Sequence, residues 1–88
     1  MKLSENYILK TVAGTPVVVP VGEAINDLNG MITLNESAEF IWKMLKNGAE
    51  RAEILAALKA EYNADESILA ADLDYFLNKL VERKILTL

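Results

Sequence analysis

The hydrophobic period of the chain changes between residues 34 and 35, and this change limits the fold more than any other feature. Residues 6–34 hold β-branched runs and turn residues, whereas apolar residues in 35–85 recur at the spacing of a helix face. At the junction, Leu34 ends an extended segment and Asn35 is a good helix N-cap. Strands followed by helices favour an α+β fold. We predict a three-stranded antiparallel sheet followed by three helices, in a winged-helix-like arrangement.

Local patterns place the elements along the chain. The strands are expected at residues 7–12, 16–21 and 30–34, and the helices at about 36–46, 50–62 and 66–84. Turn residues predict a reversal over 13–15 and a loop over 22–29. Pro20 lacks a backbone N–H, which indicates a strand end, a bulge or an unpaired edge. A last extended segment is expected at 85–88.

Each predicted helix carries one apolar stripe, and these stripes should form the core. Trp42 lies on the inner stripe of the first helix, so we expect its side chain to be mostly buried. The stripes of the three helices are Ala38, Ile41, Trp42 and Leu45; Ile54, Leu55, Leu58 and Tyr62; and Leu69, Leu73, Phe76, Leu77 and Leu80.

Length and composition bound the class of protein. The 88 residues predict a single domain, residues 1–88, and 52% apolar residues are too many for a disordered segment. No apolar run reaches the roughly 18–20 residues that span a bilayer, and the first residues lack the apolar stretch of a signal peptide. We therefore expect a cytoplasmic protein without a membrane partner.

The residues needed for most catalytic sites are missing. The chain has no Cys and no His, which removes thiol chemistry, the usual general base and the commonest metal ligand. Asp72 and Asp74 are two residues apart on a helix and do not share a face. We expect a protein that is not an enzyme and has no cofactor and no metal. The net charge of −4 also argues against nucleic acid as a partner.

The third predicted strand has an unprotected edge. Its sequence contains neither proline nor charge, the usual devices that blunt a free edge. One interpretation is that a loop or a helix covers this edge; the other is that the edge adds a strand from a partner. In the second case a proline at Ile32 should remove a backbone donor or strain the strand, and so weaken peptide binding. The candidate residues are Asn29, Gly30, Met31, Ile32 and Thr33.

The third predicted helix carries a second stripe about a quarter-turn from its core stripe. It consists of Ile68, Asp72, Tyr75 and Lys79. The stripe either packs at the boundary of the core or forms one wall of a groove, with the first three as contact residues. Ala70, Asp74 and Val81 flank the core on the other side. Five acids and no base lie in residues 61–78, which indicates a solvated face or a basic partner.

The sequence resembles the pyrroloquinoline-quinone biosynthesis protein D (PqqD) family, whose fold is also called the RiPP recognition element. The motif residues are Leu34-Asn35-Glu36-Ser37, Ala38, Ile41-Trp42, Gly48, Ile54, Leu58, Tyr62, Asp72 and Phe76-Leu77. This chain has Asn47-Gly48 where many members have Asp-Gly, and Lys84-Ile85 where many have Gly-Leu.

The resemblance implies a peptide chaperone. Family members bind the leader of a ribosomally made precursor peptide, which adds as a strand and lies against the third helix. They present the precursor to a modifying enzyme, often a radical S-adenosylmethionine (SAM) protein. One alternative is a winged-helix DNA-binding regulator, although the third helix offers only Lys79, Arg83 and Lys84 as bases near its end. Another is a structural subunit that forms a homodimer through the free edge.

Overall fold

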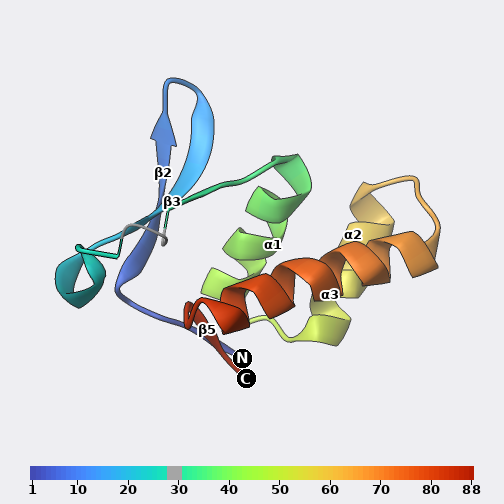
Figure 1. Cartoon of the computed structure of the whole chain (residues 1–88). Coiled ribbons are helices and arrows are strands. Elements are labelled where there is room, and N and C mark those ends of the chain that lie inside the picture. The colour runs from blue at the N-terminus through green and yellow to red at the C-terminus, as the bar shows by residue number, and fades with distance from the viewer. Residues whose placement is uncertain (28–30) are drawn as a thin grey trace.

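The computed structural model describes residues 1–27 and 31–88, and it confirms the α+β class (Figure 1). A three-stranded antiparallel sheet in the order β2-β3-β4 is followed by three helices. The sheet strands are β2 (Tyr7–Val12), β3 (Thr15–Pro20) and β4 (Ile32–Thr33). The helices are α1 (Glu36–Lys46), α2 (Arg51–Glu61) and α3 (Glu66–Glu82).

A two-residue turn joins β2 to β3. Ala13 and Gly14 have φ values of 51° and 82°, so both central residues adopt the positive φ of a type I′ turn. This turn matches the right-handed twist of the two strands and fixes their register, in which Val12 pairs with Thr15 and Tyr7 with Pro20. The predicted reversal over 13–15 is therefore correct to within one residue.

Two prolines fit into β3 because of this register. Val21 N–H donates to Asn6 O at 2.7 Å, and hydrogen-bonded positions alternate along an antiparallel pair. The odd-numbered residues of β3 therefore bond to β2, whereas the backbone groups of Pro16 and Pro20 point to the other side. The missing N–H groups do not interrupt the β2–β3 ladder, and Pro20 ends the strand, which is one of the roles predicted for it.

Strand β4 is shorter than the expected 30–34. It pairs with β3 only through Ile32, opposite Val18, and Thr33, opposite Val17. Next to this pair, Leu34 N–H donates to Pro16 O at 2.9 Å. The chain enters α1 immediately afterwards, so β4 is a short edge strand whose far side has no strand partner in the described ranges.

Helix ends follow local capping signals. Asn35 caps α1 as predicted: its side chain accepts a hydrogen bond from Ala38 N. Gly48 takes a φ of 86° just after α1, and the hydrogen bond from Ala49 N to Met44 O closes a Schellman motif. Helix α2 begins with a capping box between Glu50 and Glu53. Predicted and observed bounds therefore agree to within two residues for all three helices.

Two short elements, strand β1 (Lys2–Leu3) and a 3₁₀ helix after β3, were not predicted. Strand β1 pairs antiparallel with β5 (Leu86–Thr87), which lies in the extended segment expected at 85–88. The two ends of the chain therefore lie side by side (Figure 1). The predicted loop after β3 contains a short 3₁₀ helix, η1 (Gly22–Ala24).

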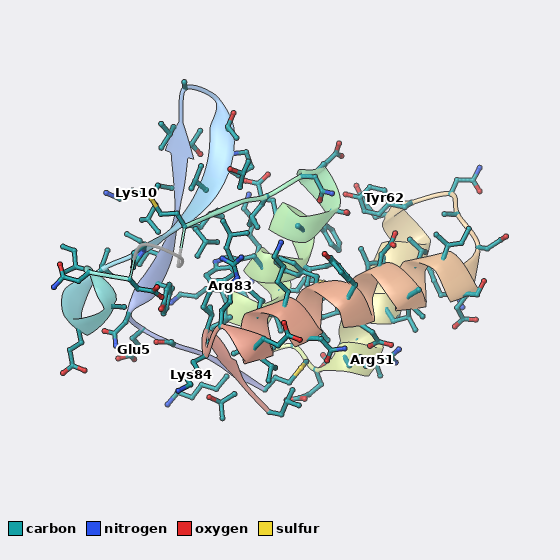
Figure 2. The ribbon with its side chains drawn as sticks, viewed as in Figure 1. Glu5, Lys10, Arg51, Tyr62, Arg83 and Lys84 are labelled. Atoms are coloured by element: carbon teal, nitrogen blue, oxygen red, sulfur yellow. The ribbon has the colours of Figure 1, made fainter. Side chains whose placement is uncertain are left out.

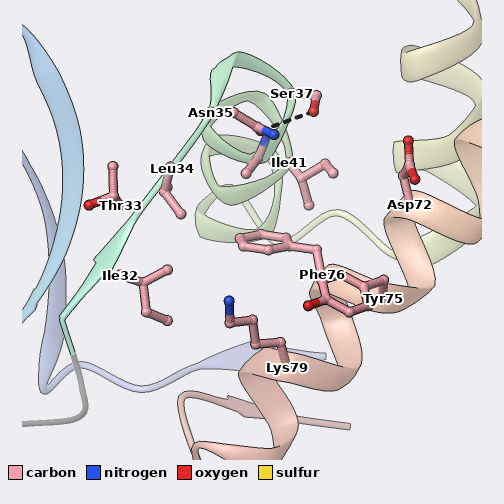
Figure 3. Close-up of a pocket in the computed structure, with 11 residues that line it drawn as sticks. Ile32, Thr33, Leu34, Asn35, Ser37, Ile41, Asp72, Tyr75, Phe76 and Lys79 are labelled. Carbon is pink, nitrogen blue, oxygen red and sulfur yellow. Dashed lines mark hydrogen bonds between the residues drawn. The ribbon is translucent and has the colours of Figure 1, made fainter.

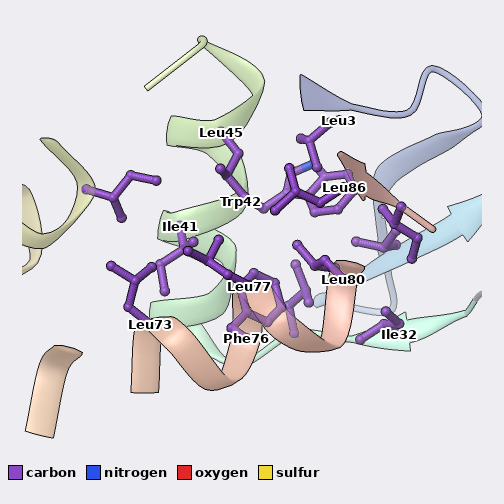
Figure 4. Packing of buried hydrophobic residues seen from close by; sticks show 14 of the residues in the cluster. Leu3, Ile32, Ile41, Trp42, Leu45, Leu73, Phe76, Leu77, Leu80 and Leu86 are labelled. Atoms are coloured by element: carbon purple, nitrogen blue, oxygen red, sulfur yellow. The ribbon is translucent and has the colours of Figure 1, made fainter. Parts of the chain in front are cut away.

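One buried cluster unites the sheet, the three helices and the β1–β5 pair (Figure 4). Trp42 is only 3% exposed, as predicted. All five residues of the predicted α3 stripe are buried, and no buried side-chain N or O atom in the described residues lacks a hydrogen bond. Among the α1 and α2 stripes, Ala38, Leu55 and Tyr62 are partly buried and pack against the cluster.

Candidate functional site

A cleft of about 270 Å³ opens between β4 and α3 (Figure 3). Residues 32–35 form one wall, and α3 forms the other. The start of α1 closes the cleft between them. Four side chains of α3 line it: Asp72, Tyr75, Phe76 and Lys79.

The β4 wall is fixed by the junction between strand and helix. Leu34 is 4% exposed and anchors the end of the strand in the core. The next residue, Asn35, accepts hydrogen bonds at Oδ1 from Ala38 N at 2.8 Å and from Ser37 Oγ at 3.1 Å. The strand thus passes into the helix without an intervening loop, so the start of α1 holds the end of β4 in place.

The α3 wall is fixed by burial. Phe76 is 8% exposed and reaches the floor of the cleft, where Ile41 of α1 also lies. Tyr75 precedes it in the sequence, but its side chain is 71% exposed. The core stripe therefore holds α3 against α1, and the neighbouring stripe stays open to solvent.

Register decides which backbone groups of β4 face outward. Because Leu34 N–H bonds to β3, alternation makes Ile32 bond to β3 as well and turns the N–H and C=O of Thr33 away from it. Thr33 is thus the residue of β4 whose main chain can pair with a guest strand. Because Ile32 bonds inward and is 7% exposed, a proline at Ile32 would act by loosening β4 from β3 and not by removing an outward donor, and its weakening of binding stays a prediction.

A second hollow of about 350 Å³ continues the cleft toward the α2–α3 connection. The two hollows share Asn35, Ser37, Ile41 and Asp72, and the second one adds Ile68 and Tyr62 among others. Ile68 is 53% exposed, so it is not needed for the core. The pKa of Tyr62 is raised by burial and, to a lesser extent, by the charges of Glu36 and Glu61.

The two flanks of α3 differ in charge pairing. Asp74 accepts hydrogen bonds from Arg51 of α2, with Oδ1 2.7 Å from Nε and Oδ2 3.0 Å from Nη2. This guanidinium lowers the pKa of the Asp74 carboxyl from its ordinary 3.8. The Asp74 flank therefore faces α2, whereas Asp72 and Tyr75 face the cleft.

The structure brings together four of the eight residues predicted for peptide binding. Ile32, Thr33, Asp72 and Tyr75 line the first cleft, and Ile68 lines the adjoining hollow. Met31 precedes β4 and is 60% exposed. The other two, Asn29 and Gly30, lie outside the described residues.

Several lining residues were not predicted for the site. Asn35 was expected only as a cap, Ile41 and Phe76 only as core residues, and Ser37 only as part of the family motif. Lys79 was placed on the right stripe but not among the contacts. A signal existed for Phe76, since it lies one position from Tyr75 and its stripe borders the exposed one.

The residues that the structure describes contain no group of three His, Cys, Asp or Glu side chains that could hold a metal ion. No helix in the described ranges combines the length and apolar character needed to cross a bilayer.

Comparisons with known proteins agree with this geometry. A structure of TbiB1 in complex with the TbiA(β) leader peptide is 26% identical, with a TM-score of 0.77, covering 97% of this chain and 93% of that one. Lasso peptide synthetase B1 complexed with the leader peptide is 19% identical, with a TM-score of 0.73 and coverages of 93% and 91%, and shows the shared fold. A comparison with curated proteins found no match. The family model described as "Coenzyme PQQ synthesis protein D (PqqD)" matches residues 17–86. The chain therefore belongs to the PqqD family.

Proposed function

We propose that this protein is a non-catalytic adaptor that binds the leader of a ribosomally made precursor peptide. One observation carries the proposal: an outward-facing strand edge at Thr33 and an exposed aromatic side chain, Tyr75, line the same cleft. The first gives main-chain pairing and the second gives an anchor, the two requirements of peptide binding by strand addition. Membership in the PqqD family and the likeness to TbiB1, solved with a leader peptide, support it.

In this proposal the leader extends the sheet beyond β4. The N–H and C=O of Thr33 pair with the guest backbone, and the exposed side chain of Met31, just before β4, contacts the guest as well. Leader side chains that point into the cleft contact Tyr75 and Asp72, and those beyond the end of β4 reach Ile68 in the adjoining hollow.

The adaptor then presents the precursor to a modifying enzyme, for which a radical SAM protein is our first candidate. The chain has neither Cys nor His, so it lacks the thiol nucleophile and the commonest general base. We place the complex in the cytoplasm, where the precursor is made, and assign the whole chain to a single domain.

The alternative of a DNA-binding regulator is less favoured by the charges. Lys10 lies on the hairpin, Arg51 at the start of α2, and Arg83 and Lys84 just after α3 (Figure 2). Apart from the group at the end of α3, these cations lie on separate elements, whereas a DNA-binding face gathers more of them. The exposed stripe of α3 instead carries Asp72 and Tyr75.

The test is isothermal titration of the protein with the leader of a short precursor encoded beside its gene. Thr33→Pro should remove the outward N–H donor and place the proline ring where the guest strand would approach. Binding should weaken by at least about fivefold. Thr11→Pro is a matched control, because Thr11 is exposed and its N–H points outward at the other edge of the same sheet.

The possible outcomes separate the three interpretations. Loss of affinity in folded Thr33→Pro but not in Thr11→Pro supports strand addition at β4. Equal binding by both variants rejects it. A salt-dependent shift of DNA would favour the regulator, and a change of mass in solution caused by Thr33→Pro alone would favour a homodimer through this edge.

A further inference from the structure

Two opposite charges lie on the α3 wall of the cleft, one on each side of Tyr75. Asp72 is one turn before Tyr75 and Lys79 one turn after it, and all three line the same cleft. Neither charged side chain makes an ion pair within 4.0 Å with any residue that the structure describes. Both charges are therefore available to a ligand.

Neighbouring carboxylates are used differently. Asp74 is bound by Arg51, and Glu66 lies 3.4 Å from the Nζ of Lys59. These two pairs join α2 to α3 and belong to the fold. Asp72 lies between them in the sequence but on the cleft side of the helix, where no cation of the described chain reaches it.

The order of the charges along the cleft is fixed by the course of α3. Asp72 lies toward the end of β4, since it shares the second hollow with Asn35, whereas Lys79 lies toward Ile32 (Figure 3). Seven residues of helix separate the two by about 10 Å along the axis. An extended peptide rises about 3.4 Å per residue, so this distance corresponds to two to four of its residues.

We propose that the cleft selects leader segments with a defined charge pattern: a basic residue opposite Asp72, an acidic residue opposite Lys79, and an apolar side chain between them. The inference rests on the proposed function and specifies its ligand. Every strand pair in this sheet is antiparallel, and a guest strand that continues this pattern begins near the end of β4. The basic residue therefore precedes the acidic one by two to four positions.

This pattern would set the direction of the bound peptide. Strand addition alone permits either direction, because the backbone offers N–H and C=O groups both ways. A peptide bound in reverse would place its acid near Asp72 and its base near Lys79, and like charges brought together are unfavourable. The two α3 charges thus select one direction, and with it the side on which the rest of the precursor leaves the cleft.

The experiment pans a displayed library of random 12-residue peptides against the whole chain. The test variants are Asp72→Lys and Lys79→Glu, and the matched controls are Glu5→Lys and Lys10→Glu. The controls change net charge by the same amounts at exposed positions on the hairpin side of the molecule (Figure 2). Circular dichroism checks that each variant is folded.

We expect the wild type and both controls to select a base followed by an acid. Asp72→Lys should select an acid at the first position, and Lys79→Glu a base at the second. A wild-type-selected peptide should bind each test variant at least about threefold more weakly, and reversing the matching charge in the peptide should restore its affinity.

The outcomes distinguish this inference from the function on which it rests. Selected peptides that bind through β4 without a charge bias, or with the acid first, overturn the charge pattern and leave the adaptor function standing. Failure of the folded wild type to select any binding peptide, together with failure to bind the encoded leader, overturns both.

Discussion

Leu73 and Tyr75 lie two residues apart on α3 and have opposite surroundings. Leu73 is fully buried in the cluster that joins α3 to the other helices, whereas Tyr75 is 71% exposed in the cleft. The same contrast holds for the stripes to which they belong. Apart from Phe76, which is buried and also reaches the floor of the cleft, α3 therefore separates the residues that stabilise the fold from those proposed to bind. A mutation elsewhere in one stripe should leave the other property nearly unchanged.

The largest expected effect is on stability. Trp42→Ala should lower the free energy of unfolding by about 3–5 kcal/mol, because it removes a large side chain that is only 3% exposed. That is a large part of the roughly 5–15 kcal/mol typical of a domain. Urea denaturation measures the change. A near-native midpoint would contradict the stabilising role assigned to Trp42 in the buried cluster.

The next effect is on binding. Tyr75→Ala should weaken leader binding by about 2 kcal/mol or more, since it removes an aromatic anchor. The free energy of unfolding should stay within about 0.5 kcal/mol, because the side chain is exposed. Titration calorimetry and urea denaturation on the same sample give both values. The separation of the two stripes is disproved if stability falls while affinity is kept.

A smaller effect compares the two aspartates of α3. Asp72→Asn should slow association with a leader that carries a cation and reduce its salt dependence, because the charge lies in the cleft. Asp74→Asn should leave the association rate unchanged, since Arg51 holds Asp74 on the other flank. Stopped-flow measurements at several ionic strengths test the pair. Equal effects of the two substitutions would show that only net charge matters.

The smallest effect concerns pH. Because Arg51 lowers the pKa of Asp74, the pair stabilises the fold fully above the ordinary pKa of 3.8, and this contribution is lost as pH falls through the folded pKa. Thermal melts of the wild type and Asp74→Asn should therefore converge in acid and differ slightly at neutral pH. Leader binding near pH 7 should not distinguish them. A difference that grows below pH 3.8 would contradict the assigned role.

The helices could be predicted because their signals are local. The cap at Asn35, the glycine at 48 and the apolar period together fix the bounds of α1, and the structure confirms them. The second stripe of α3 could be found for the same reason, since side chains on a helix face recur at a known spacing. Its exposure at Tyr75 and Ile68 follows from burial of the first stripe.

The strands could be predicted less well because pairing is not local. Strands β1 and β5 have two residues each, too few to show a period, and Lys2 pairs with Thr87 at the far end of the chain. The choice between Ile32 and Thr33 depends on the register against β3, and a shift of one residue exchanges inward and outward groups. Only the structure could assign the outward N–H to Thr33.

The shortness of β4 has a consequence for how tightly a guest can bind. Only two residue pairs join β4 to β3, against six between β2 and β3, so β4 should open locally more easily than the other strands of the sheet. Whenever β4 detaches, the site is lost, so the apparent affinity equals the intrinsic affinity multiplied by the attached fraction. A bound guest should in turn slow amide hydrogen exchange at Ile32 and Leu34, whose N–H groups point away from the guest. Protection there would report the closing of the strand itself.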